Sequence, residues 1–244
     1  MSDFRYYRPS NFPPVVKNLI IINVLVFVGQ LTVPHLTDRL MLYPIMPASL
    51  HQILLENNAI DEYQKFQPYQ IFTHLFSHSP TMFAHILFNM FALWMFGRIL
   101  ENVWGPKRFL FFYLVSGVGA AALHLTMQYF RCEALLQDII ANSPAVTPER
   151  IMGASAPALG ASGAIMGLFA AFAYLFPNTE LFFLFIPFPI KAKWMVLIMV
   201  GLDLFGGFSK VSGDNVAHFA HLGGAITGFI IVFIWNKTNR RTLY

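Results

Sequence analysis

Charged residues and cysteine are scarce in this 244-residue sequence. Asp, Glu, Lys and Arg together make up 11% of the chain, whereas a soluble domain carries about 25%. That scarcity excludes an ordinary soluble domain, and the 56% of hydrophobic residues indicates a protein that crosses a membrane several times. Because Cys132 is the single cysteine, an internal disulfide is excluded and the redox compartment stays open.

Acidic residues are fewer than basic ones, with 12 Asp and Glu against 16 Lys and Arg. A net charge of +4 is compatible with nucleic-acid binding, but the basic residues are scattered at the ends of apolar segments. Basic residues in these positions set the orientation of membrane proteins. We therefore expect the lipid bilayer, and no nucleic acid, as a partner.

Six apolar segments can each cross the hydrocarbon core as a helix, which takes about 20 residues, or fewer where the bilayer thins. They cover residues 18–33, 81–100, 109–130, 159–176, 194–208 and 216–235. The first of them lacks a small-residue cleavage site and is predicted to be an uncleaved span. A further apolar stretch at 181–190 contains Pro187 and Pro189, which favour an interfacial connector over a seventh span.

The sequence thus predicts an all-α polytopic membrane protein with one domain. The six-span domain covers 18–235, and short tails at 1–17 and 236–244 flank it. Two long connections at about 34–80 and 131–158 lie on the same side of the bundle. We expect the first to hold short interfacial helices and the second to hold one helical turn or more.

The basic residues fix the orientation. With the N-terminus inside, 11 Lys and Arg face the cytoplasm and 5 face the outside, so both termini are predicted to be cytoplasmic. The inner set is Arg5, Arg8, Lys17, Arg98, Lys107, Arg108, Lys191, Lys193, Lys237, Arg240 and Arg241. The outer set is Arg39, Lys65, Arg131, Arg150 and Lys210.

The motif Gly-Ala-Ser-Gly at 160–163 opens the fourth segment. The N-terminus of a helix exposes backbone N–H groups that favour negative charge, so Ser162 lies beside donors for an oxyanion. Gly160, Gly163 and Gly167 follow at i, i+3 and i+7 and form a stripe of small residues. The alternative is that this stripe is only a packing groove between helices.

The sixth segment supplies His218 and His221, one helical turn apart. His221 shares its helix face with Gly224 and Gly228, which permit close helix packing. If this face meets the glycine stripe of the fourth segment, His221 lies near Ser162 and can take the serine proton. The alternative is that both histidines satisfy neighbouring polar groups or bind a metal.

The second segment supplies His85 and Asn89, at i and i+4 on one helix face. Both side chains can donate hydrogen bonds, and donors aimed at a developing oxyanion contribute a few kcal/mol of transition-state stabilisation. The alternative is a hydrogen-bonded pair that only holds the bundle together.

The spacing of the acidic residues does not argue for a Ser-His-Asp triad. Asp203 lies in the fifth segment and Asp214 in the loop before the sixth, and only the packing of the helices could bring either carboxylate close to a histidine. A Ser-His dyad is the simpler hypothesis. No His-Glu-x-x-His motif is present, and Cys132 has no partner at ligand spacing, so we expect no metal and no other cofactor.

Taken together, these motifs resemble those of the rhomboid intramembrane serine proteases. The resemblance is carried by His85 and Asn89, by Gly-Ala-Ser-Gly at 160–163 and by Ala-His-Leu-Gly-Gly at 220–224. Residues 97–109 also resemble the family's cytoplasmic turn between spans two and three, and residues 70–76 resemble the entry into span two.

The resemblance implies a six-helix rhomboid-like bundle that cleaves other membrane proteins in or near a transmembrane segment. Ser162 would attack the scissile carbonyl, and His221 would be the general base and then the acid. The Ser162 N–H, His85 and Asn89 would stabilise the oxyanion. Positioning or packing roles fall to Gly160, Gly163, His218 and Gly224. A bacterial inner membrane is the expected location, and the oligomeric state stays open.

Two other functions remain to be weighed. A catalytically silent rhomboid-like protein would bind membrane clients without cutting them, and its sign would be loss of the serine or the histidine. A small transporter would use the histidines as a proton relay and would show acidic pairs or broken helices in matching halves. For a protease, the fifth segment is the expected lateral gate, since Gly206 and Gly207 loosen its outer end.

Overall fold

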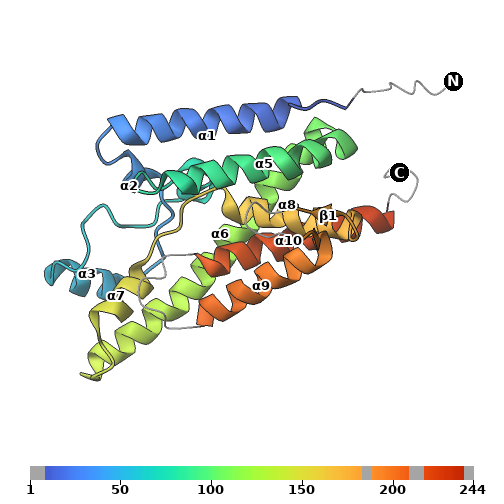
Figure 1. The fold of residues 1–244 in the computed structure, drawn as a ribbon. Coiled ribbons are helices and arrows are strands. Elements are labelled where there is room, and N and C mark those ends of the chain that lie inside the picture. Colours follow the sequence, from blue (N-terminus) through green and yellow to red (C-terminus); the bar gives the residue numbers. More distant parts are fainter. Residues whose placement is uncertain (1–8, 183–187, 209–216, 239–244) are drawn as a thin grey trace.

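A computed structural model describes residues 9–182, 188–208 and 217–238 (Figure 1). Within these residues, the long helices are α1 (Pro14–Thr32), α5 (Phe83–Trp104), α6 (Pro106–Ile140), α8 (Ser162–Leu175), α9 (Ala192–Phe208) and α10 (His218–Thr238). The short elements are α2 (Leu36–Leu40), α3 (Ala48–Glu56), α4 (Gln70–Thr73), the 3₁₀ turn η1 (His74–Phe76), α7 (Pro148–Ser155) and the strands β1 (Glu180–Leu181) and β2 (Ile190–Lys191). Parts of both tails, Pro187, Lys210 and Asp214 lie outside the described residues.

Each predicted apolar segment overlaps one long helix, but α6 is longer than expected. The third segment was predicted to end at residue 130, whereas α6 continues to Ile140. Its additional turns bury Cys132 and Leu135 against Leu50 of α3 and Ala154 of α7, in a hydrophobic cluster at the end of the bundle where the two long connections lie. This cluster stabilises the additional turns of α6.

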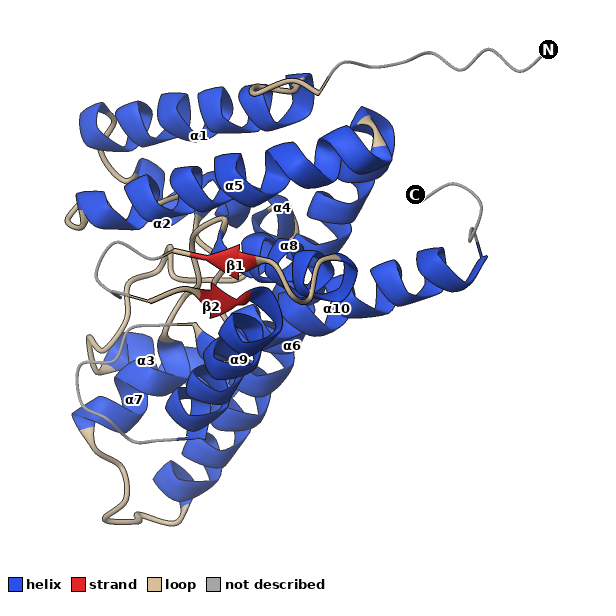
Figure 2. Ribbon diagram, turned by 45° about the vertical axis from the view of Figure 1, so that its right-hand side comes forward, coloured by secondary structure: helices blue, strands red, loops and turns tan. Residues whose placement is uncertain are grey.

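The described chain is mostly helical, as predicted, and also has one short pair of strands. β1 and β2 pair antiparallel, with Glu180 opposite Lys191 and Leu181 opposite Ile190, and Figure 2 shows them beside the start of α9. These strands flank the stretch that was predicted as an interfacial connector. In addition, Leu42 and Ala158 exchange two backbone hydrogen bonds of 2.8 and 2.9 Å, which join the two long outer connections.

The protein is a helical integral membrane protein. In the described part of the chain, α1, α5, α6 and α10 are long and apolar enough to cross a membrane. The 14 residues of α8 extend only about 21 Å at 1.5 Å per residue, less than a hydrocarbon core of about 30 Å. The six-span count therefore stays a prediction.

Helix α8 lies at the centre of the bundle and contacts α5, α6, α9 and α10. The long helices alternate in direction, so α1 begins and α10 ends at the same end of the bundle (Figure 1). At that end, the carboxylate of Glu101 accepts hydrogen bonds from the N–H groups of Val15 and Val16 at 3.0 and 2.8 Å. A negative charge at a helix N-terminus is stabilising, so Glu101 fixes the start of α1 against α5.

Candidate active site

Ser162 is the first residue of α8 and follows a sharp turn. Gly160 makes this turn with a φ of +116°, a conformation that favours glycine. The Gly160 N–H donates to the carbonyl of His74 at 2.9 Å, which ties the turn to η1. The N–H groups in the first turn of α8 have no partner inside the helix, so they are available beside the Ser162 hydroxyl.

The structure brings Ser162 and His221 into contact. Ser162 Oγ lies 2.9 Å from His221 Nε2, although the residues are 59 positions apart in the sequence. Close packing of α8 against α10 sets this distance. A Cβ added to Gly224 would overlap the carbonyl of Gly163, and one added to Gly228 would lie 2.6 Å from the Cα of Gly167.

A carboxylate completes a Ser-His-Asp arrangement, which the spacing did not indicate and which the packing of α9 against α10 produces. His221 Nδ1 lies 3.0 Å from Oδ1 of Asp203, which is buried on α9. An ionised carboxylate only accepts hydrogen bonds, so the ring proton is on Nδ1 and Nε2 is free to accept from the Ser162 hydroxyl. This is the tautomer that a general base requires.

A sequence signal for Asp203 existed but was missed. Asp203 is the only acidic residue in the six predicted apolar segments. An ionisable side chain at membrane depth marks a functional site by default. Helical spacing within the fifth segment could not show which helix the carboxylate would meet.

His218 contacts the same carboxylate. Its Nδ1 lies 2.8 Å from Asp203 Oδ1, so one oxygen receives donors from two histidines. A Cβ on Gly206 would overlap the His218 ring, which shows how closely α9 approaches α10 at this point. Of the two histidines, His221 is the one whose Nε2 contacts Ser162.

His85 borders the same space from α5. The N–H of Ser79 lies 3.2 Å from His85 Nδ1 and donates to it, so the His85 ring proton is on Nε2. A Cβ placed on Gly160 would lie 2.8 Å from this Nε2 and 3.6 Å from Ser162 Oγ. The His85 Nε2–H therefore points a donor toward the region next to the serine.

Asn89 makes a hydrogen bond within its own helix. Its amide donates at 2.7 Å to the carbonyl of His85, one turn earlier in α5, and its side chain is buried. This local bond uses one of the two N–H donors of the amide. In this conformation, Asn89 stabilises the turn of helix that carries His85.

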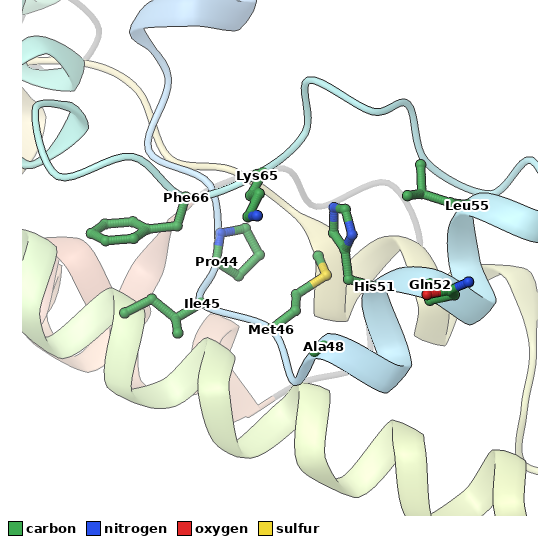
Figure 3. Close-up of a pocket in the computed structure, with 9 residues that line it drawn as sticks. All are labelled: Pro44, Ile45, Met46, Ala48, His51, Gln52, Leu55, Lys65 and Phe66. Carbon is green, nitrogen blue, oxygen red and sulfur yellow. The ribbon is translucent and has the colours of Figure 1, made fainter.

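A cavity of about 290 Å³ lies elsewhere, at the outer end of the bundle beside α3 (Figure 3). Its lining consists of Pro44, Ile45, Met46, Ala48, His51, Gln52, Leu55, Lys65 and Phe66. None of these residues belongs to the arrangement around Ser162. Contacts between helices position the serine, the two histidines of α10 and Asp203, and this cavity is not part of their site.

A known family model covers the region that holds these residues. The model of the Rhomboid domain matches residues 65–238, which include all four of His85, Ser162, Asp203 and His221. The chain belongs to the rhomboid family. The matched part begins after α3, so α1 lies outside it.

Three rhomboid relatives show the extent of the similarity. Rhomboid protein 1, mitochondrial, from Saccharomyces cerevisiae is 30% identical over 64% of this chain and 38% of its own length. Rhomboid protease AarA from Providencia stuartii is 31% identical over 61% of this chain and 50% of its own. Rhomboid protease GluP from Bacillus subtilis is 30% identical over 60% of this chain and 22% of its own length. The chain thus spans half or less of the length of these relatives.

Proposed function

We propose that this rhomboid protein is a serine endopeptidase that cleaves transmembrane segments of other membrane proteins. The observation that carries the proposal is the 2.9 Å contact between Ser162 Oγ and His221 Nε2. A serine hydroxyl is a weak nucleophile unless a base takes its proton. Two of the relatives described above are named rhomboid proteases, which supports the same reaction class.

In the proposed mechanism, Ser162 Oγ attacks the scissile carbonyl while His221 Nε2 accepts the hydroxyl proton. Asp203 keeps the His221 ring in the required tautomer and stabilises the imidazolium that forms. His221 then gives the proton to the leaving amine, and water releases the acyl group by the reverse sequence of proton transfers. This assignment replaces the predicted dyad with a dyad supported by a carboxylate.

The oxyanion would be stabilised by the Ser162 N–H at the start of α8 and by the His85 Nε2–H. Donors that are already oriented cost no rearrangement when the charge develops. Asn89 would contribute directly only through a change of rotamer, since its amide donates to the His85 carbonyl. We therefore assign the larger share to His85.

We further propose six spans with both termini in the cytoplasm. The alternating helix directions in Figure 1 support this topology, as does the excess of basic residues at the predicted inner ends. Helices α8 and α9, with 14 and 17 residues, would then require a locally thinner bilayer. The relatives include mitochondrial proteins, so the bacterial inner membrane stays a prediction.

The test is labelling of the detergent-solubilised protein with a fluorophosphonate, which forms a covalent bond with an activated serine. We expect the unmodified chain to label and to cleave a transmembrane substrate. Ser162→Ala and His221→Ala should each lower cleavage by roughly 10⁴-fold or more, and the double variant should do no further harm because the two act as a unit. Ser155→Ala is the matched control, because Ser155 donates to the Ile151 carbonyl of its own helix. If the folded protein showed no labelling and no cleavage, a client-binding role would be favoured instead.

A further inference from the structure

Arg131, in the outer half of α6, has contacts that the proposed chemistry does not use. Its Nη2 donates to the carbonyl of Gly207 at 2.8 Å, and its Nη1 donates to Gln128 Oε1 at 3.1 Å. The guanidinium carbon also lies 5.2 Å from the centre of the Phe219 ring. One charged group thus joins α6 to the outer end of α9 and to the first turn of α10.

Each of these partners lies close to a residue of the active site. Gly207 follows Asp203 by one helical turn on α9, and Phe219 lies between His218 and His221 on α10. A shift of the Gly207 carbonyl would therefore shift the carboxylate of Asp203.

Gln128 connects the same guanidinium to the loop that leads to the serine. Gln128 is buried, and its amide donates at 3.0 Å to the carbonyl groups of Gly153 and Ala156. This loop then continues to the Gly160 turn and the start of α8. Arg131 accordingly contacts α9 and α10 directly and, through Gln128, the loop that leads to Ser162.

The outer end of α9 has little apolar packing to hold it. Leu202 and Phe205 are 63% and 71% exposed, and Gly206 and Gly207 contribute no side chains. Carbonyl groups in the last turn of a helix have no partner inside the helix and carry a partial negative charge. A guanidinium at that end is therefore well suited to hold it in place.

We propose that Arg131 is a positioning residue that holds the outer end of α9 where Asp203 reaches His221. The proposal rests on the function proposed above, because it assigns Asp203 a role in orienting the base. Arg131 touches neither the serine nor the scissile bond. Its effect on the reaction passes through the position of the carboxylate.

The test compares Arg131→Gln, Arg131→Lys and the control Arg150→Gln, in which the lost arginine pairs with Asp138 on the outer side. We expect Arg131→Gln to slow fluorophosphonate labelling of Ser162 and to lower kcat by about tenfold, with little change in KM. Arg131→Lys should restore part of the rate, because an ammonium can still donate to the Gly207 carbonyl. Arg150→Gln should behave as the unmodified chain.

A double-mutant cycle separates positioning from a general loss of structure. In an Asp203→Asn background, Arg131→Gln should reduce the remaining rate by less than about twofold, because the two residues act in sequence. A full tenfold loss in that background would overturn the proposal. So would faster cleavage with unchanged labelling, which would make Arg131 a restraint on substrate entry.

A structural measurement keeps the test independent of activity. Spin labels at Phe111→Cys on α6 and Phe205→Cys on α9 report the distance between the helices, and both side chains are exposed. We expect one distance distribution with Arg131 and a broader or shifted one with Arg131→Gln. If the unmodified chain failed to label with fluorophosphonate, the proposed function would fall, while this distance would still decide whether Arg131 positions α9. An unchanged distribution would refute the positioning role.

Discussion

Helix α10, which carries His221, packs against α8 on one side and against α9 on the other, and the two interfaces differ. On one side, α8 and α10 meet through Gly163, Gly167, Gly224 and Gly228, and their backbones touch. On the other side, α9 meets α10 through polar contacts of Asp203 while much of its apolar surface faces outward. The serine and the base therefore share a packed interface. The carboxylate instead lies toward the end of α9, whose apolar packing is concentrated near its beginning, at Ala192 and Met195.

This difference separates two properties of the site. Packing that is as dense as a crystal resists small displacements, so the Ser162–His221 distance should survive changes in α9. The contact between His221 and Asp203 should be lost more easily, because the described residues at the end of α9 meet side chains of α10 and not its backbone. Substitutions can therefore remove the orientation of the base while leaving the nucleophile and base in contact.

The largest effect is expected where a methyl group is added to the packed interface. Gly224→Ala would drive a Cβ into the Gly163 carbonyl, and the backbone can relieve this only by separating α8 from α10. We expect a loss of about 3 kcal/mol or more in unfolding free energy and no fluorophosphonate labelling. Thermal unfolding in detergent measures the first and gel fluorescence the second.

Gly201→Ala on α9 is the matched control. A Cβ at Gly201 would meet nothing within 4 Å, and alanine favours a helix over glycine by about 1 kcal/mol. This variant should be as stable as the unmodified chain or slightly more so. Equal destabilisation by both substitutions would contradict the contrast between the two sides.

A smaller effect is expected from Asp203→Asn on the loosely held side. The asparagine amide can donate to His221 Nδ1 and so favour the tautomer that cannot accept the serine proton. We expect kcat to fall by about 10²- to 10⁴-fold with an unchanged melting temperature, because the α8–α10 interface is untouched. Asp38→Asn, which changes an acid that pairs with His35 in an outer connection, serves as the control. Full activity of Asp203→Asn would show that the dyad needs no carboxylate.

The contrast between the two sides also explains what the sequence could predict. Ser162, His221 and the glycine stripes lie at helical spacing within their own segments, so a local pattern placed them on facing surfaces. Asp203 meets His218 and His221 only through the approach of α9 to α10, and no spacing within one segment encodes that contact. The continuity of α6 through residue 140 was not predicted for a similar reason, since α3 and α7 supply the cluster that stabilises its last turns.

The smallest expected effect is on the pH dependence of stability. It tests whether the dense packing seen between α8 and α10 extends to His78, just before α5. His78 is fully buried, and its backbone exchanges two hydrogen bonds with the side chain of Gln30. Both ring nitrogens lack a hydrogen-bond partner within the described residues. Burial, with a smaller contribution from His85, lowers the pKa of His78 from 6.5 to about 3.

Because of this shift, the unfolded chain binds a proton at His78 below about pH 6.5 while the folded protein does not. Stability contributed by the neutral ring is therefore present above pH 6.5 and is lost as the pH falls toward 3. His78→Leu removes the titrating group, so its melting temperature should decline less steeply than that of the unmodified chain over this range. The expected difference is several degrees at pH 4.5, measured as melting temperature against pH. His35→Leu, at an exposed position, should leave the slope unchanged. If the unmodified chain and His78→Leu gave parallel curves, water would reach the His78 ring, and the packed region would end before α5.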